Sequence, residues 1–460
     1  MARAIRAGLV KLPQSGIAVP PPAGLNCKPH PCALPNVLAS PGGSQPVDED
    51  PISVDPNNNK HIVSAGNDYN CGSSLRGFFA STDGGKTWVV KCGPVASGAT
   101  GGDGDPAVAW DLNGNVFSAG IDALPSGDTQ ISVSKSTDHG NTWGTPVAAA
   151  KVSGIFMDKE WLEADTTPTS PHANSLYLSI TQFVGNNSQI GVSHSSDGGA
   201  TWTLKNVDSQ QIYPTFVDQF SDLAIGADGT VYVSWLRCPA NGPTGDCGGT
   251  TSAMYMSKST DGGNTWSKEV KIQSVALAPD SCGAFYGCLP NTFERVSNIP
   301  VIAIDNAATS ANFGTLYVVD YNWTGTYMKA QVTSSTDGGA TWSKAVGMAP
   351  DGNTHDQFFP WINVSSTGLI GATWLDRSLD PANVNYCAFG ATGKKVKQLG
   401  GANLQICDVQ SNPFDDGFGS GFMGDYDVNA WDPVKKKLYY SWTDTRNGST
   451  SQNEVGGLRP

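Results

Sequence analysis

Acidic side chains recur where short apolar segments of the sequence begin. Asp105, Asp158 and Asp425 each stand at or just before such a segment. Two carboxyl groups that flank one bond can act as general acid and as nucleophile or base, which is the chemistry of glycoside hydrolysis. The pattern makes acid–base chemistry on a sugar one candidate activity.

The arginines are few and unevenly distributed. The chain has eight, of which three lie in the terminal segments, and the other five stand near the ends of apolar segments: Arg76, Arg237, Arg295, Arg377 and Arg446. A guanidinium group offers a planar fork of donors that suits a carboxylate or phosphate. If the five share one face with the carboxylates, they suit an anionic sugar. The alternative is that each arginine pairs with a neighbouring aspartate.

Two repeats must position these side chains. The first is an octapeptide of the form Ser-x-Asp-x-Gly-x-Thr-Trp, which occurs at 81–88, 136–143, 195–202, 259–266 and 335–342. Alternating residues flank each copy, so each is read as a β-hairpin whose aspartate and glycines build the turn. These octapeptides are interpreted as folding devices that carry no chemistry.

The second repeat is an apolar strand, an Asp/Gly turn and a strand rich in aromatic residues. It occurs seven times, at 50–66, 105–120, 160–180, 221–236, 300–321, 360–375 and 426–442. A repeating four-stranded unit without helical periodicity predicts an all-β fold, a single β-propeller of seven blades, with six as the alternative. The propeller is expected over 33–460, with 33–40 completing the last blade, after an N-terminal extension at 1–32.

The octapeptides resemble the Asp-box, or bacterial neuraminidase repeat, of the sialidase-like superfamily of secreted propellers. The resemblance implies an arginine triad on a substrate carboxylate, a Tyr/Glu nucleophile pair and an aspartate acid/base. It also implies an Arg-Ile-Pro motif ahead of the first Asp-box, where this chain reads SSLRGFFAS.

In a four-stranded blade the turn between the third and fourth strands lies on the same face as the turn between the first and second. The Asp-box turns are therefore expected at the rear of the ring. The opposite, front face should carry the long connections at 237–252, 273–298 and 399–424, and binding usually uses the face with long loops.

The resemblance assigns candidate roles on this front face. Glu160 is the expected general base, with Tyr321 or Tyr426 as nucleophile and Asp105 or Asp158 as the acid. Asp356 is a further candidate catalytic carboxylate, and Trp323 is a candidate sugar-binding side chain.

A cation is a second interpretation of the recurring aspartates. Asp105, Asp158, Asp356 and Asp425 would ring the mouth of the central channel. Like charges this close raise pKa values or recruit a cation, and oxygen ligands favour Ca²⁺. Asp425 is the candidate calcium ligand, although no cofactor is expected to be required. The alternative is a structural aspartate that binds strand amides.

Composition limits the partners and the compartment. The formal net charge of −13 argues against nucleic acid, and there is no apolar run long enough to span a membrane. Ten cysteines predict five local disulfides and an oxidising compartment, extracellular or periplasmic. The expected pairs are Cys27/Cys32, Cys71/Cys92, Cys238/Cys247, Cys282/Cys288 and Cys387/Cys407. The first residues do not resemble a signal peptide, so a mature chain is expected.

The sequence thus predicts a secreted, sialidase-like glycoside hydrolase that acts from the chain end of an acidic glycan. Two alternatives stay open. One is a non-catalytic glycan- or protein-binding propeller, and the other is a polysaccharide lyase.

Overall fold

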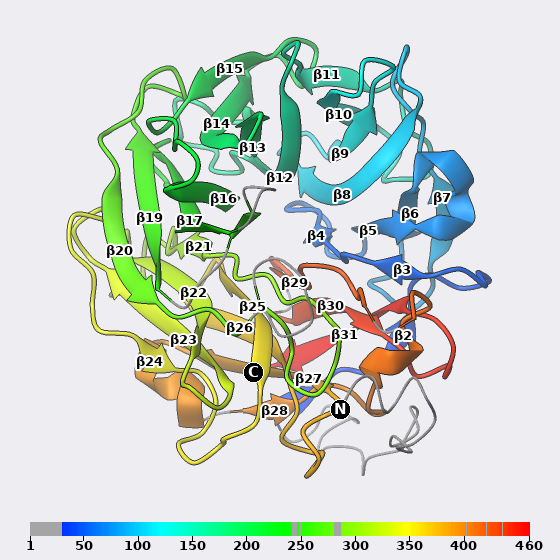
Figure 1. The fold of residues 1–460 in the computed structure, drawn as a ribbon, viewed down its shortest axis with the longest axis vertical. Coiled ribbons are helices and arrows are strands. Elements are labelled where there is room, and N and C mark those ends of the chain that lie inside the picture. The colour runs from blue at the N-terminus through cyan, green and yellow to red at the C-terminus, as the bar shows by residue number, and fades with distance from the viewer. Residues whose placement is uncertain are drawn as a thin grey trace.

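The computed structural model describes residues 30–241, 246–247, 251–279, 287–401, 403–419, 421–434 and 436–460. These residues form seven antiparallel sheets arranged in a ring (Figure 1). The predicted all-β propeller with seven blades is confirmed, and the alternative of six is excluded. The helices in the described part are three short 3-10 helices: η1 (Tyr69–Ser74), η2 (Val396–Gly401) and η3 (Pro413–Asp415).

Each blade is numbered by its order in the chain, and its strands run from the channel outward. Blade 1 holds β3 (Val47–Asp48) and β4 (Ile52–Val54), then β5 (Ile62–Asp68), β6 (Arg76–Ser81) and β7 (Val89–Cys92). Blade 2 holds β8 (Gly101–Trp110), β9 (Val116–Ala123), β10 (Thr129–Ser136) and β11 (Val147–Ala150). Blade 3 holds β12 (Phe156–Ala164), β13 (Leu176–Val184), β14 (Asn187–Ser195) and β15 (Thr203–Asn206).

The next three blades repeat this order. Blade 4 holds β16 (Phe216–Ile225), β17 (Val231–Asn241), β19 (Ser252–Ser259) and β20 (Val270–Val275), with β18 (Asp246–Cys247) paired to β17. Blade 5 holds β21 (Val301–Ile304), β22 (Leu316–Trp323), β23 (Met328–Ser335) and β24 (Val346–Gly347). Blade 6 holds β25 (Gln357–Val364), β26 (Ile370–Asp376), β27 (Cys387–Gly393) and β28 (Leu404–Gln405).

Blade 7 is built from both ends of the chain. Its strands β29 (Val428–Trp431), β30 (Leu438–Asp444) and β31 (Gln452–Arg459) come from the C-terminal part. β1 (Cys32–Ala33) and β2 (Val37–Leu38) pair with the outer side of β31. Residues 33–40 therefore contribute to the last blade. The boundary between an extension at 1–32 and the propeller stays a prediction, because residues 1–29 lie outside the described part.

The octapeptides form the turns between the third and fourth strands of blades 1 to 5. In the copy at 335–342, the Ser335 hydroxyl donates to Asp337 Oδ1 (2.8 Å), and the Gly339 amide donates to Ser335 (3.0 Å). Thr341 donates to Asp337 through its amide (2.9 Å) and its hydroxyl (2.6 Å). The turn therefore satisfies its own polar groups while Trp342 packs against the core. This supports the interpretation of the octapeptides as folding devices.

Three of the predicted disulfides are confirmed. Cys71–Cys92, Cys238–Cys247 and Cys387–Cys407 are bonded. Cys32 and Cys288 are also disulfide-bonded, but their predicted partners Cys27 and Cys282 lie outside the described residues. Within the described residues, the helices lack the length and apolar character needed to cross a membrane.

Strand direction defines two faces. The innermost strand of every blade begins on one face, here called the front, and ends on the other, here called the rear. Because successive strands are antiparallel, the octapeptide turns lie at the rear. The connections from one blade to the next lie at the front.

Candidate active site at the front of the ring

The innermost strands are irregular where they begin at the front. Pairing shifts register within β8, β12, β16 and β25. The left-handed backbone is adopted by Asp105 (φ 56°), Lys159 (φ 55°), Phe220 (φ 60°) and Phe359 (φ 47°), and by Glu49 (φ 57°) between β3 and β4. This conformation is uncommon for non-glycine residues and concentrates at functional sites. The repeated bulges mark the front mouth of the channel as the candidate site.

Lys159 stands at the centre of this mouth. Its ammonium lies 3.3 Å from Glu49 Oε1, 3.3 Å from Asp105 Oδ2 and 3.4 Å from Asp425 Oδ2. The three carboxylates come from blades 1, 2 and 7. Burial opposes the charge, but the carboxylates, Asp105 foremost, raise the pKa of Lys159. The ammonium is therefore a permanent positive charge that holds the front ends of four blades together.

Arg295 forms the second cationic contact of this cluster. Its guanidinium binds Asp425 through Nε to Oδ1 (3.0 Å) and through NH2 to Oδ2 (2.6 Å), and it lies 4.7 Å above the Phe422 ring. Burial opposes ionisation of Asp425, but Arg295 and Lys159 hold its pKa below the usual range. Arg295 lies in the long connection before blade 5, and Asp425 lies in the connection before blade 7.

Asp158 is a carboxyl of this cluster that can gain or lose its proton near neutral pH. Burial, together with the negative charge of Asp105, raises its pKa to about 7. Gln219 Nε2 donates to Asp158 Oδ2 at 2.7 Å and fixes the group from blade 4. The Asp105 side chain is 14% exposed. One carboxyl that keeps its proton beside another that is partly open to solvent matches the requirement of acid–base catalysis.

Asn67, at the end of β5, orders the acidic side of the mouth. Its Nδ2 donates to Asp48 Oδ1 and to Glu49 Oε2, both at 3.0 Å, and its Oδ1 accepts the Asp105 amide at 2.9 Å. Burial raises the pKa of Asp48 and Glu49, with further contributions from nearby carboxylates. Blades 1 and 2 are therefore connected through one amide side chain.

Three aromatic rings close the channel beneath the cluster. Trp161 packs against Trp361 (ring centroids 4.7 Å apart) and against Tyr426 (5.6 Å). The Tyr426 hydroxyl donates to the Pro106 carbonyl at 2.7 Å, and the Lys159 ammonium lies 4.3 Å from its ring. Tyr426 is 3% exposed, and burial raises its pKa. It therefore lies at the site as part of the floor.

Glu160 lies next to Lys159 in the chain and is 2% exposed. Neither of its carboxylate oxygens has a hydrogen-bond partner among the described residues, and burial, with the charge of Asp105, raises its pKa. Burial therefore disfavours the ionised form of this carboxyl. The structure brings Glu160 to the cluster, near the charges of Asp105, Asp158 and Lys159.

A cavity of about 570 Å³ opens at the rear beyond the aromatic floor, whereas the recess beside Asp425 and Tyr426 measures about 10 Å³. The lining of the larger cavity includes Glu163, whose pKa burial raises to about 7, and Asp222. Among its described lining residues there is no lysine or arginine. The front mouth combines acids with two cations, so it is the better candidate for catalysis.

The other four predicted arginines are paired within or between blades. Their acidic partners and separations are Arg76 with Asp122 (2.9 Å), Arg237 with Asp218 (2.5 Å), Arg377 with Asp356 (3.3 Å) and Arg446 with Asp444 (2.8 Å). Arg377 is fully buried. Of the five predicted arginines, the structure brings only Arg295 to the cluster around Lys159. The other four each pair with an aspartate, which was the alternative interpretation of the sequence.

Three further predicted residues also lie apart from the cluster. Asp356 accepts the Met328 amide (2.9 Å) and the Asn383 side chain (2.7 Å), so it connects blades 5 and 6. Tyr321 is fully buried, and its pKa is raised mainly by burial. Trp323 is half-buried and packs against the hydrophobic core cluster that includes Tyr321. Asp356 thus connects neighbouring blades, and Tyr321 and Trp323 belong to the packing of blade 5.

The sequence reasoning missed Glu49, Asn67 and Lys159 as members of the site. One signal was available, since the triplets at 48–50 and at 158–160 both place consecutive charged residues at the front end of a blade. Nothing in the sequence marks Asn67, which acts through three contacts that only the fold brings together.

One group of potential cation ligands centres on Asp425. Both carboxylate oxygens of Asp425 face Arg295, and one also faces Lys159, so a Ca²⁺ ion there would compete with two bound cations. The calcium role of Asp425 stays a prediction.

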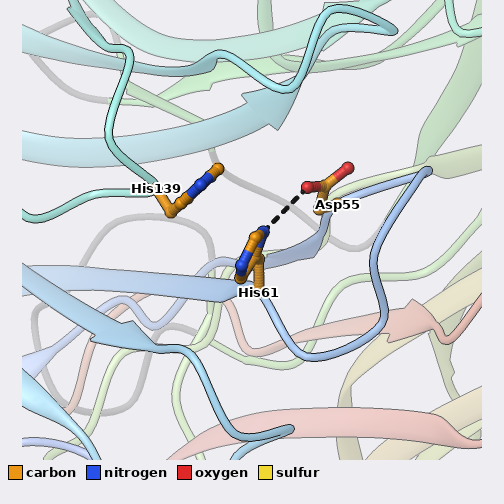
Figure 2. Close-up of side chains that lie close together, drawn as sticks. All are labelled: Asp55, His61 and His139. Atoms are coloured by element: carbon orange, nitrogen blue, oxygen red, sulfur yellow. Dashed lines mark hydrogen bonds and ion pairs between the residues drawn. The ribbon is translucent and has the colours of Figure 1, made fainter.

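The second group lies at the rear, where Asp55, His61 and His139 meet between blades 1 and 2 (Figure 2). His61 Nδ1 lies 3.1 Å from Asp55 Oδ2, but the His61 and His139 rings stack face to face, with centroids 3.7 Å apart. Ring nitrogens bind metals in the ring plane, so stacked rings do not aim at one ion. The group acts as a packing contact.

The chain is similar to known proteins over part of its length. No protein-family model matches it. A xyloglucanase from Paenibacillus sp. is 26% identical over 349 residues, which cover 66% of this chain and 30% of that protein. A sialidase from Bacteroides fragilis (strain YCH46) is 26% identical over 295 residues, which cover 58% of this chain and 48% of that protein. The chain thus spans less than half of either relative.

A solved structure supports the same fold. The intramolecular trans-sialidase from Ruminococcus gnavus superposes with a TM-score of 0.50 at 13% identity, covering 74% of this chain and 92% of that one. The chain is thus a seven-bladed propeller that is similar in sequence to a xyloglucanase and to a sialidase, both glycoside hydrolases, and similar in fold to a trans-sialidase. Three disulfides fit an extracellular protein.

Proposed function

We propose that the protein is a glycoside hydrolase whose active site is the front mouth of the channel. The observation that carries the proposal is Asp158, a carboxyl with a pKa of about 7 beside Asp105 and Lys159. Asp158 acts as the general acid that protonates the leaving oxygen. Asp105, held 3.3 Å from the Lys159 ammonium, acts as the second carboxylate, either as nucleophile or as base for water.

The proposed Tyr/Glu nucleophile pair of sialidases has weaker support in this chain. The hydroxyl of Tyr426 is bound to a backbone carbonyl, and Lys159 lies against its ring. A hydroxyl in this position cannot reach a sugar in the mouth unless the floor rearranges. We therefore assign Tyr426 and Glu160 to positioning the cluster.

Local electrostatics bear on the substrate class. The acidic-glycan prediction depended on several arginines in one place, and Arg295 is the member of that set at the mouth. Its guanidinium is already paired with Asp425, while the surrounding groups are mostly carboxyls. We propose a glycan whose reacting sugar is uncharged, with an acidic sugar as the alternative that the same assay tests.

The proposal also includes secretion of the protein and the identity of its octapeptide turns. The disulfides are proposed to form in an oxidising compartment during export. The octapeptide turns, with their Ser–Asp–Thr hydrogen bonds, are proposed to be Asp-boxes in the family sense. Carbohydrate is the proposed partner.

The test is hydrolysis of a panel of 4-methylumbelliferyl glycosides, of sialyllactose and of xyloglucan, with product analysis by chromatography. Wild type, Asp158→Asn and the matched control Asp228→Asn, which alters an exposed aspartate in a rear turn, are compared. The expected result is release of one sugar class, lost in Asp158→Asn and retained in Asp228→Asn. Glycan binding without turnover would replace the proposal with a non-catalytic propeller, and an unsaturated product would indicate a lyase.

A further inference from the structure

Exposed apolar side chains form a strip on the front between blades 3 and 4. Phe156 (43%), Val184 (41%), Ile212 (56%) and Phe216 (41%) all present a large part of their surface to solvent, and Phe183 is half-buried beside them. These five residues are called the front apolar strip. Contiguous exposed apolar surface on a soluble protein usually marks a binding site.

The members of the strip lie next to one another. Phe156 is paired with Phe183 across β12 and β13, and their ring centroids are 6.3 Å apart. Val184 pairs with Asn187 in the adjoining hairpin, and Asn187 Oδ1 accepts the amide of Tyr213, the residue after Ile212.

Phe216 joins the strip from the next blade. The Asp218 amide, two residues beyond Phe216, donates to the Ser188 hydroxyl at 2.8 Å. The start of β16 therefore runs beside the start of β14. The strip therefore follows the front edge of blades 3 and 4, with Phe156 and Phe183 on one side of the blade 3 sheet and Val184, the residue after Phe183, on the other.

The strip begins beside the proposed acid. Phe156 and Asp158 are two residues apart in β12, ahead of its register shift, so both side chains project from the same side of the strand. Two residues of strand span roughly 7 Å, a distance comparable to one sugar ring. On the blade 4 side, Gln219 contacts Asp158 and lies three residues from Phe216.

We infer that the front apolar strip is a subsite for the leaving-group portion of a glycan chain. A general acid protonates the oxygen of the leaving group, so surface that continues outward from the acid lies on the leaving-group side of the cleaved bond. The aromatic rings of Phe156 and Phe216 stack against the apolar C–H faces of sugar rings. This inference rests on the proposed function and extends it to oligosaccharide and polysaccharide substrates.

The size of the strip favours a glycan over a protein partner. A fully buried aromatic side chain contributes roughly 150–250 Å², so these partly exposed side chains together offer a few hundred square ångströms at most. A stable protein interface buries roughly 800 Å² on each partner. One or two stacked sugar rings match the smaller area.

The experiment compares Phe156→Ala with Phe313→Ala. Phe313 is 52% exposed and lies in the rear turn between β21 and β22, so it controls for the loss of an exposed phenylalanine. Each change is made in the wild-type chain and in Asp158→Asn. Kinetics are measured on an aryl glycoside and on an oligosaccharide of the same reacting sugar, and binding of the Asp158→Asn proteins is measured on a glycan array.

For Phe156→Ala we expect kcat/KM on the oligosaccharide to fall by roughly tenfold, with less than about a twofold change on the aryl glycoside. Array binding should weaken in parallel, and Phe313→Ala should leave both readouts unchanged. Equal losses on the two substrates, unchanged oligosaccharide kinetics, or no glycan bound on the array would overturn the subsite. If turnover is absent but array binding depends on Phe156, the proposed hydrolase fails while the subsite stands as a glycan-binding surface.

Discussion

The ammonium of Lys159 lies 3.4 Å from Oδ2 of Asp425. Lys159 belongs to blade 3 and Asp425 to the connection that leads into blade 7, so this ion pair joins two blades that are not neighbours. Glu49 and Asp105 complete the same contact from blades 1 and 2. One buried cation therefore compensates carboxylates from three other blades. This arrangement fixes the positions of the acids relative to one another, which acid–base chemistry requires.

Replacing Lys159 with methionine should destabilise the protein strongly. The change keeps much of the side-chain volume but leaves three carboxylates without their shared cation. Removing one partner of a buried ion pair typically costs about 3–5 kcal/mol. The free energy of unfolding from a urea titration is the measurement, with the exposed Lys344→Met as the matched control. A change below about 1 kcal/mol would show that Lys159 does not hold the cluster.

Asp158 should set the alkaline limit of activity. Because a general acid must carry its proton, kcat/KM should fall as pH rises through about 7. The same shift affects stability. The folded state retains this proton at pH values where the carboxyl of the unfolded chain, with its ordinary pKa of 3.8, has lost it. This group's contribution to stability should therefore decrease from about pH 4 to pH 7.

The measurement is a pH–rate profile beside the pH dependence of the unfolding temperature, for wild type and Asp158→Asn. Asparagine does not titrate, so the variant should lose this component of the pH dependence of stability. A wild-type profile without an alkaline limb near neutral pH would contradict the role of Asp158 as acid.

The fold was more predictable than the site, and the reason is the range of the interactions. Each octapeptide turn closes its hydrogen bonds within seven residues, as in Ser335 to Thr341. Its sequence pattern can therefore be recognised without knowledge of the rest of the fold. The cluster joins Glu49, Lys159 and Asp425, which lie far apart in the chain. No local pattern indicates which blades adjoin at the mouth.

The arginines illustrate the same limit. Arg446 and Asp444 are neighbours in sequence and bind each other, as expected if each arginine pairs with a neighbouring aspartate. Arg295 binds Asp425, which lies 130 residues later in the chain. From sequence alone the two arginines look equivalent, because both stand near the end of an apolar segment.

Arg295 and Arg446 should therefore respond differently to replacement by methionine. Arg295 is 29% exposed at the proposed site, so its loss should raise KM and change the pKa of the neighbouring carboxyls. Arg446, bound to Asp444 and Asp408 and distant from the cluster's contacts, should affect stability more than kinetics. Michaelis–Menten kinetics and thermal unfolding of both variants provide the comparison. Equal kinetic losses would mean that Arg295 has no special role at the mouth.

Zinc should not stabilise the protein through His61 and His139. The stacked rings of these residues do not direct their nitrogens at one point (Figure 2), so an added ion gains no complete ligand set. The unfolding temperature in added Zn²⁺ should match that in chelator, for wild type and for His139→Gly. Glycine is the residue that the other four octapeptides carry at this position. A rise with zinc that His139→Gly abolishes would establish a metal site instead.

The octapeptide aspartates should contribute to unfolding in acid. Hydrogen bonds from the Thr341 hydroxyl and amide, with one from Ser335, lower the pKa of Asp337 to about 2, from the ordinary aspartate value of 3.8. Because the folded pKa is depressed, the stabilisation is complete above about pH 4 and is lost as pH falls through about 2. Thr341→Val removes the hydroxyl donor, so it should raise this pKa and lower the unfolding temperature at pH 7. The variant and wild type should then converge toward pH 2. Thr309→Val, at an exposed position outside the octapeptides, is the matched control. A constant difference between variant and wild type at every pH would mean that Thr341 acts through packing and not through the charge of Asp337.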